Sequence, residues 1–125
     1  MRISSITLAL AALALSLPWH AALAADAAAG AAIVKAKCGV CHSVEAGKNR
    51  VGPSLFGVVG RHSGSVAGYN YSEANKNSGK TWDEATLDVY LTNPRALVPG
   101  TKMAFPGLPT ADDRANVIAY LVTLK

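Results

Sequence analysis

Cysteine is scarce in this chain, with two residues in 125. Two cysteines cannot form the network of disulfides that stabilises many small domains. Runs of lysine and arginine are also absent, although the formal net charge is +4. The chain therefore has no basic segment of the kind that binds nucleic acid. The mild surplus of positive charge instead favours an acidic protein partner.

Long apolar runs are limited to one, Ile6–Leu17, close to the amino terminus. At about 12 residues it is shorter than the roughly 20 that a membrane-spanning helix needs. Pro18 and the small residues Ala22 and Ala24 follow it. This order is typical of a signal peptide, so we predict export to the periplasm, with residues 1–24 removed by cleavage after Ala24. Residues 25–125 would remain as one soluble, monomeric domain without a membrane anchor.

Strand-like alternation and internal repeats are also missing, which predicts an all-α domain. Apolar periodicity predicts helices over 26–37, from about Thr81 to a limit at Pro94, and over 110–125, with a shorter helix over 72–77. Thr81 and Glu84 fit a capping box for the second helix. Two long loops rich in glycine and proline, 43–70 and 93–109, separate these helices. Loops this long in so small a domain are usually functional or wrap around another group.

Both cysteines stand in KAKCGVCHSVE, where His42 directly follows Cys41. A redox disulfide between Cys38 and Cys41 is possible outside the cytoplasm, but a thioredoxin-like pair needs a βαβ setting that the chain lacks. A zinc site needs about four ligands, and His62 is the one further histidine of the mature chain. Haem attachment uses every residue of the motif. The two thiols, three apart on a helical turn, can both reach one edge of a haem, and the histidine lies under the iron.

A second iron ligand has few candidates. Export leaves one methionine, Met103, in the loop sequence VPGTKMAFPG. A loop rich in glycine and proline is an unusual place for a core methionine and a suitable place for a distal ligand. His62, in GRHSGS, is the competing ligand, and an iron with an open position is the third alternative. A thioether ligand would raise the reduction potential relative to a histidine ligand.

These motifs and their order resemble the class I cytochromes c, of the mitochondrial and bacterial cytochrome c2 type. The resemblance covers nearly all of residues 25–125 and rests on KCGVCHSVE, GPSLFGVVGR, YSEANKNSGKTW, VYLTNPRALVPGTKMAFPG and VIAYL. It implies a small cytochrome c fold, with four or five helices and long loops around one covalently bound haem c. It also implies an electron transfer protein rather than an enzyme, and a crossing of the first and last helices at Gly30, Val34 and Tyr120.

The resemblance also implies roles for individual residues. Covalent haem binding falls to Cys38 and Cys41, and ligation of the iron to His42 and Met103. Around these, Pro53 would accept a hydrogen bond from the ligand histidine, and the remaining positions surround the haem. They are Arg61, Tyr71 and Trp82 at a propionate, and Asn75, Tyr90 and Thr101 beside the methionine. The basic residues that the chain keeps for partner docking are Lys37, Arg95 and Lys102, fewer than in the mitochondrial form.

The predicted function is a periplasmic one-electron carrier between membrane or periplasmic redox complexes, such as an acidic-faced reductase and oxidase. Photosynthetic, respiratory and denitrifying chains all use carriers of this kind. Two other functions stay open. A haem enzyme or gas-binding sensor with a labile sixth ligand would bind carbon monoxide readily. A cytochrome subunit of a larger oxidoreductase would purify together with its partner.

Overall fold

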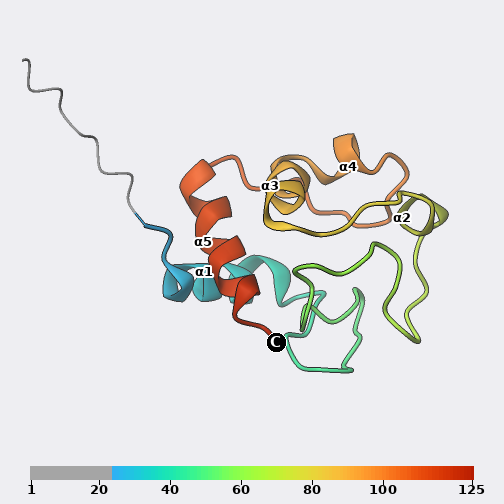
Figure 1. The fold of residues 1–125 in the computed structure, drawn as a ribbon, viewed down its shortest axis with the longest axis horizontal. Coiled ribbons are helices and arrows are strands. Elements are labelled where there is room, and N and C mark those ends of the chain that lie inside the picture. Colours follow the sequence, from blue (N-terminus) through green and yellow to red (C-terminus); the bar gives the residue numbers. More distant parts are fainter. Residues whose placement is uncertain (1–23) are drawn as a thin grey trace, which may run out of the picture.

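The structure is a computed structural model that describes residues 24–125. All of the predicted signal peptide except Ala24 lies outside the described residues. The described part contains no strand, which confirms the predicted all-α class (Figure 1). None of its helices is long and apolar enough to cross a membrane. In chain order the elements are α1 (Ala27–Ile33), the π-helix η1 (Val34–Cys38), α2 (Glu73–Lys76), α3 (Glu84–Thr92), α4 (Pro94–Leu97) and α5 (Ala111–Val122).

The first and last helices, α1 and α5, cross in close contact (Figure 1). Gly30 is buried at the crossing, and a Cβ atom added there would lie 1.9 Å from the carbonyl oxygen of Asn116. A side chain at this position would therefore force the two backbones apart. Val34 and Val117 are 2% and 1% exposed. The crossing predicted at Gly30 and Val34 is thus present, and it anchors both ends of the domain.

The first helix changes its winding before it reaches the cysteines. A single helix over 26–37 was predicted, but the α-helix ends at Ile33 and a π-helical turn continues to Cys38. The N–H of Gly39 bonds the carbonyl of Val34, five residues back, at 2.8 Å. Such π-turns are rare and often occur next to functional sites. No apolar period in the sequence announces this turn.

The predicted capping box of the helix now labelled α3 is wrong. The cap is Asp83, whose carboxylate accepts a hydrogen bond from the N–H of Thr86 at 2.7 Å. Thr81 instead forms an isolated bridge with His62. The carboxylate accepts a hydrogen bond from one of the free N–H groups of the first turn. The cap is therefore two residues further along the chain than predicted. Pro94 does limit α3, as predicted, but it also begins the short helix α4, which was not predicted.

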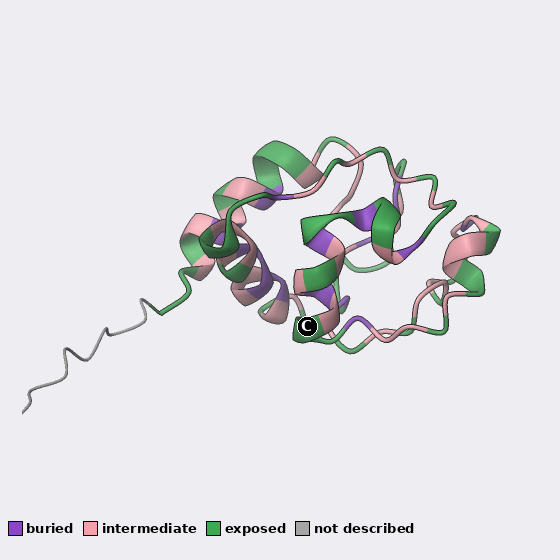
Figure 2. Ribbon diagram, turned by 90° about the horizontal axis from the view of Figure 1, so that it is seen from above, coloured by how far each residue is buried: buried purple, intermediate pink, exposed green. Residues whose placement is uncertain are grey.

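The other two predicted helices form with shorter bounds. The predicted helix 72–77 is α2, capped by the hydroxyl of Ser72. The predicted helix 110–125 is α5, which starts one residue later and ends at Val122. Figure 2 shows the buried residues gathered where the helices meet, whereas the long loops are mostly half-buried or exposed. The loops therefore need another partner for the faces that they turn inward.

Candidate haem site

A cavity of about 640 Å³ lies between the two long loops and the inner faces of α3 and α5. This volume is within the range of cofactor sites, roughly 300–1,000 Å³. Thirteen of the residues that the sequence predicted for haem binding or partner docking line it: Lys37, Cys38, Cys41, His42, Pro53, Arg61, Tyr71, Asn75, Trp82, Tyr90, Thr101, Lys102 and Met103. His62 and Arg95 are not among the lining residues. The fold therefore brings together side chains that lie up to 66 positions apart in the sequence, from Lys37 to Met103.

Cys38 and Cys41 lie on one turn at the end of η1. The N–H groups of Cys41 and His42 both bond the carbonyl of Cys38, at 3.0 and 2.9 Å. Both thiols are free and half-buried. Burial raises the pKa of the Cys38 thiol, and the neighbouring Cys41 adds to this effect, while Lys37 opposes it. No three His, Cys, Asp or Glu side chains gather as metal ligands anywhere in residues 24–125, so a zinc ligand set is not assembled there.

His42 is held with one ring nitrogen engaged and the other available. Its Nδ1 lies 2.7 Å from the carbonyl oxygen of Pro53. A carbonyl can only accept, so Nδ1 carries the proton and Nε2 keeps its lone pair for a metal. Burial lowers the pKa of His42, with the nearby charge of Arg61 acting in the same direction and the Pro53 carbonyl opposing. The ring is therefore neutral at pH 7, which is the form that binds iron.

Gly52, whose role was not predicted from the sequence, provides the space in which the His42 ring lies. A Cβ atom added at Gly52 would be 2.3 Å from Cε1 of the ring and 2.6 Å from Nδ1. The glycine N–H also bonds the carbonyl of Cys41 at 2.7 Å. Gly52 directly precedes Pro53, whose carbonyl was expected to contact the His42 ring. A residue next to that contact must also fit against the ring, so the glycine at this position was a signal that could have identified its role.

Met103 lies in the loop between α4 and α5, with its sulfur next to Tyr90. The Tyr90 hydroxyl is 3.7 Å from the sulfur, and its ring packs on Trp82 with 4.6 Å between centroids. Burial raises the pKa of Tyr90, and hydrogen bonds with Thr101 and Asn75 partly offset this. The phenol is thus protonated at neutral pH and can donate to the sulfur. Of the residues expected beside the methionine, Tyr90 contacts its sulfur and Thr101 contacts its N–H, while Asn75 lines the same cavity.

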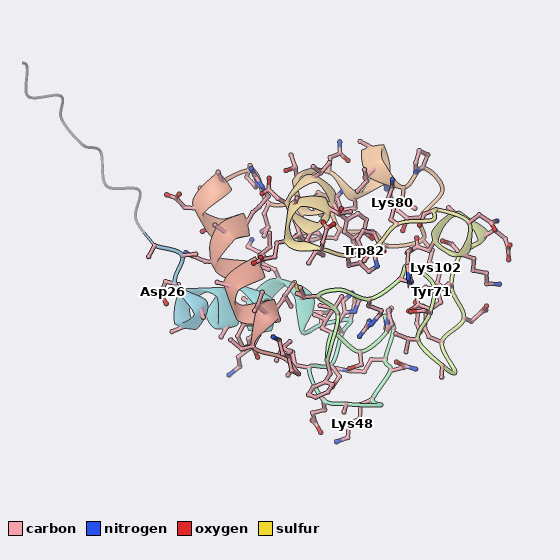
Figure 3. All side chains as sticks on the ribbon, in the orientation of Figure 1. Asp26, Lys48, Tyr71, Lys80, Trp82 and Lys102 are labelled. Carbon is pink, nitrogen blue, oxygen red and sulfur yellow. The ribbon has the colours of Figure 1, made fainter. Side chains whose placement is uncertain are left out.

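Arg61 supplies positive charge to the cavity. Its guanidinium donates to the carbonyl of Ser54 at 2.9 Å and to that of Phe56. Burial lowers its pKa, and Tyr71 opposes this. No carboxylate in residues 24–125 forms an ion pair with it. A half-buried guanidinium without an acidic partner suits an anionic group of a ligand, such as a propionate. Trp82 and Tyr71, both buried, also line this cavity, and Figure 3 labels both side chains.

Basic and apolar side chains share the rim of the cavity. Lys37 and Lys102 are both exposed there, and Figure 3 labels Lys102. The Lys102 ammonium lies over the ring of Tyr69, 4.9 Å from its centroid. Val40 and Val51 also line the cavity and are 73% and 75% exposed. Arg95 is exposed on α4, outside the lining. Of the three basic residues expected at the docking edge, two are therefore at the rim.

The predicted competitor for the iron, His62, lies in a different environment. It is exposed and its Nδ1 is 3.1 Å from the hydroxyl of Thr81. Its backbone forms the isolated bridge with the same residue. The ring thus belongs to the outer surface and not to the cavity that contains His42 and Met103.

The groups around this apolar cavity fit a haem. The two thiols on one turn would bind its vinyl groups, and the imidazole with a free Nε2 and the thioether sulfur would bind its iron. The guanidinium of Arg61, which has no acidic partner in residues 24–125, would bind a propionate. The fold and this donor set together define a small helical haem protein.

Comparison with known proteins agrees with this class. The cytochrome c family matches residues 27–125. Cytochrome c2 of Rhodoblastus acidophilus is 58% identical over 90 residues, which cover 71% of this chain and 84% of the relative. Cytochrome c2 iso-2 of Magnetospirillum molischianum is 54% identical over 101 residues, covering 81% of this chain and 100% of the relative. The solved structure of cytochrome cH from Methylobacterium extorquens superposes with a TM-score of 0.74 at 49% identity, over 78% of this chain and 98% of that one.

The chain belongs to the cytochrome c family. It is accordingly an electron carrier rather than an enzyme, and its cofactor is one covalently bound haem c.

Proposed function

We propose that the mature protein is a monomeric, periplasmic one-electron shuttle whose iron is ligated by His42 and Met103. The observation that carries this proposal is the shared cavity, which both side chains line and which His62 does not. His42 follows η1 and Met103 precedes α5, and the close contact of α1 with α5 keeps these two segments in one domain. When bound, the haem supplies an iron that gains and loses one electron.

The protein residues adjust and protect that iron. The Pro53 carbonyl, 2.7 Å from Nδ1, orients His42 and makes its free nitrogen a stronger donor. The Tyr90 hydroxyl, 3.7 Å from the sulfur, withdraws electron density from Met103. The thioether and its hydrogen bond both favour the reduced iron and thus a high potential. If His42 and Met103 both hold the iron, this chain would leave no position on it for a substrate.

The test of this ligand set is carbon monoxide binding to the reduced protein at neutral pH. The wild-type protein should bind it poorly, because Met103 would hold the iron and exclude the gas. Met103→Ala should bind it readily, while His62→Ala should behave like the wild type. Ready binding by the wild-type protein would reject the shuttle and favour the enzyme or sensor alternative.

Partner docking is proposed at the rim formed by Lys37, Lys102, Val40 and Val51, where the cavity opens to solvent. The two lysines would guide an acidic partner to this rim, and the two valines would lose water on contact. Arg95 would contribute from α4 at longer range. The association rate with the redox partner should fall as salt rises, since exposed charges are screened over about 10 Å at 0.1 M. A rate that is the same at low and high salt would reject this role of the lysines.

Export is proposed to leave a chain that starts at Ala25. Cleavage after Ala24 would preserve Asp26, whose carboxylate accepts hydrogen bonds from the N–H groups of Ala28 and Ala29 at the start of α1. The mass of the exported protein should therefore correspond to residues 25–125 plus one haem. A retained amino terminus, or purification in a stable complex, would instead favour a fixed subunit of a larger oxidoreductase.

A further inference from the structure

The loop that carries Met103 is held unevenly along its length. Before the methionine, the N–H of Thr101 bonds the carbonyl of Val98 at 3.0 Å, and the N–H of Met103 lies 3.3 Å from the Thr101 hydroxyl. After it, residues 104–107 form no backbone–backbone hydrogen bond with any part of the described chain. The position of Met103 therefore depends on where the loop is next attached.

That attachment is at Leu108, which is 2% exposed. Its N–H bonds the carbonyl of Leu91, on α3, at 2.7 Å. Gly107 packs on the same helix end, because a Cβ atom added there would lie 2.3 Å from the carbonyl oxygen of Thr92. The loop thus returns onto α3 five residues after the proposed iron ligand.

Arg114, in the first turn of α5, clamps this return point. Its Nη1 donates to the carbonyl oxygens of Leu108 and Pro109, at 2.9 and 3.1 Å. Its Nε donates to Oδ1 of Asp88, on α3, at 2.8 Å. The arginine side chain is 12% exposed, although the aspartate is 51% exposed. One planar guanidinium thereby joins α5, α3 and the loop, a geometry that the single ammonium of a lysine does not reproduce.

We propose that Arg114 is a positioning residue for Met103, because it fixes the carbonyls of Leu108 and Pro109 and so limits movement of the sulfur away from the iron. This inference rests on the proposed ligation by Met103. Removal of the Arg114 side chain has two separate effects on the loop, one on its entropy and one on its hydrogen bonds. Because the bond from the Leu108 N–H to the Leu91 carbonyl does not involve Arg114, the loop keeps that attachment to α3 without the clamp. Even an unattached segment lengthened from about four to about seven residues would change the equilibrium for closing the loop by only about twofold. Loss of hydrogen bonds from a charged, buried donor corresponds to about tenfold or more. The hydrogen bonds therefore dominate the expected effect.

The experiment is an imidazole titration of the oxidised holoprotein, followed by the far-red sulfur-to-iron band that reports Met103 ligation. Arg114→Gln should raise the apparent affinity for imidazole about tenfold. Asn116→Ala is the matched control, because its Oδ1 accepts a hydrogen bond from the Asp26 N–H at 2.7 Å and it lies on the same helix. It should leave the imidazole affinity unchanged. The stability of each variant to denaturant is measured in parallel.

An imidazole affinity that rises in Arg114→Gln but not in Asn116→Ala supports the positioning role. Equal rises in both variants, or none in Arg114→Gln, overturn it and leave Arg114 with a general role in stability. If Arg114→Gln does not fold, Asp88→Asn decides the question, with an expected rise of about threefold because the guanidinium loses its charged partner. No rise in Asp88→Asn would then overturn the inference. A wild-type protein without the sulfur band overturns the proposed function itself, a result distinct from a band that is present but insensitive to Arg114.

Discussion

Replacement of Gly52 by alanine should destabilise the His42 side of the haem site more than the small size of one methyl group suggests. The new Cβ atom would lie 2.3, 2.6 and 2.8 Å from three atoms of the imidazole ring. All three distances are far below van der Waals contact, so the ring or the backbone must move. Gly52 has no positive φ angle, so the cost comes from the collision and not from backbone strain. Overpacking of this kind costs about 1–3 kcal/mol.

Movement of the ring would also weaken the 2.7 Å hydrogen bond to Pro53, which contributes about 0.5–1.5 kcal/mol more. The free energy of unfolding of the holoprotein should therefore fall by roughly 1.5–4.5 kcal/mol in Gly52→Ala. The assay is denaturant unfolding, with the haem spectrum as a second observable. Val51→Ala is the control, because its side chain is 75% exposed and its loss should change stability by about 0.5 kcal/mol or less. A Gly52→Ala protein as stable as this control would refute the steric reasoning.

Three further predictions concern other parts of the molecule. Gly30→Ala should destabilise the protein by at least about 2 kcal/mol in denaturant unfolding, since its Cβ would meet a backbone carbonyl of α5 at 1.9 Å; a smaller loss would mean that the helices can separate easily. The pKa of Asp83 lies below its ordinary value of 3.8 because its carboxylate caps α3. The contribution of this carboxylate to folding stability is therefore present above pH 3.8 and is lost as the pH falls through the lowered pKa. Asp83→Asn should keep the stability at neutral pH and lose this dependence on acid, as measured by denaturant midpoints between about pH 5 and pH 2. Tyr90→Phe should lower the reduction potential by a few tens of mV in voltammetry, because Met103 would lose a hydrogen bond and become a better donor to ferric iron; an unchanged potential would argue against that bond.

The sequence was sufficient for the parts of the fold that depend on local pattern. The helices now seen as α1, α3 and α5 were expected from apolar periodicity. Gly30 was expected, from the family resemblance, where α1 crosses α5. The cap of α3 was assigned wrongly because Thr81 and Asp83 are both good capping residues, and their spacing alone does not decide between them. The π-turn η1 and the short helix α4 carry no periodic signal, since neither extends beyond five residues.

The candidate site was predictable where one residue type carries the chemistry. Cys38, Cys41 and His42 stand together in the chain, and Met103 is the only methionine left after the predicted cleavage. Gly52 and Arg114 were not found, because their importance comes from what they touch. In the sequence, Gly52 looks like an ordinary loop residue and Arg114 like an ordinary helix residue. Only the fold shows that Gly52 makes room for the His42 ring and that Arg114 binds two carbonyls.

The proposed ligation by His42 and Met103 is tested most directly by absorption spectra of the exported protein in both oxidation states. The reduced protein should show the sharp α band of a c-type haem, and the oxidised protein should show the weak far-red sulfur-to-iron band. That band should be absent from Met103→Ala and present in His62→Ala. Covalent haem without the band, or a band lost in His62→Ala and kept in Met103→Ala, would contradict the ligand set assigned to this cavity.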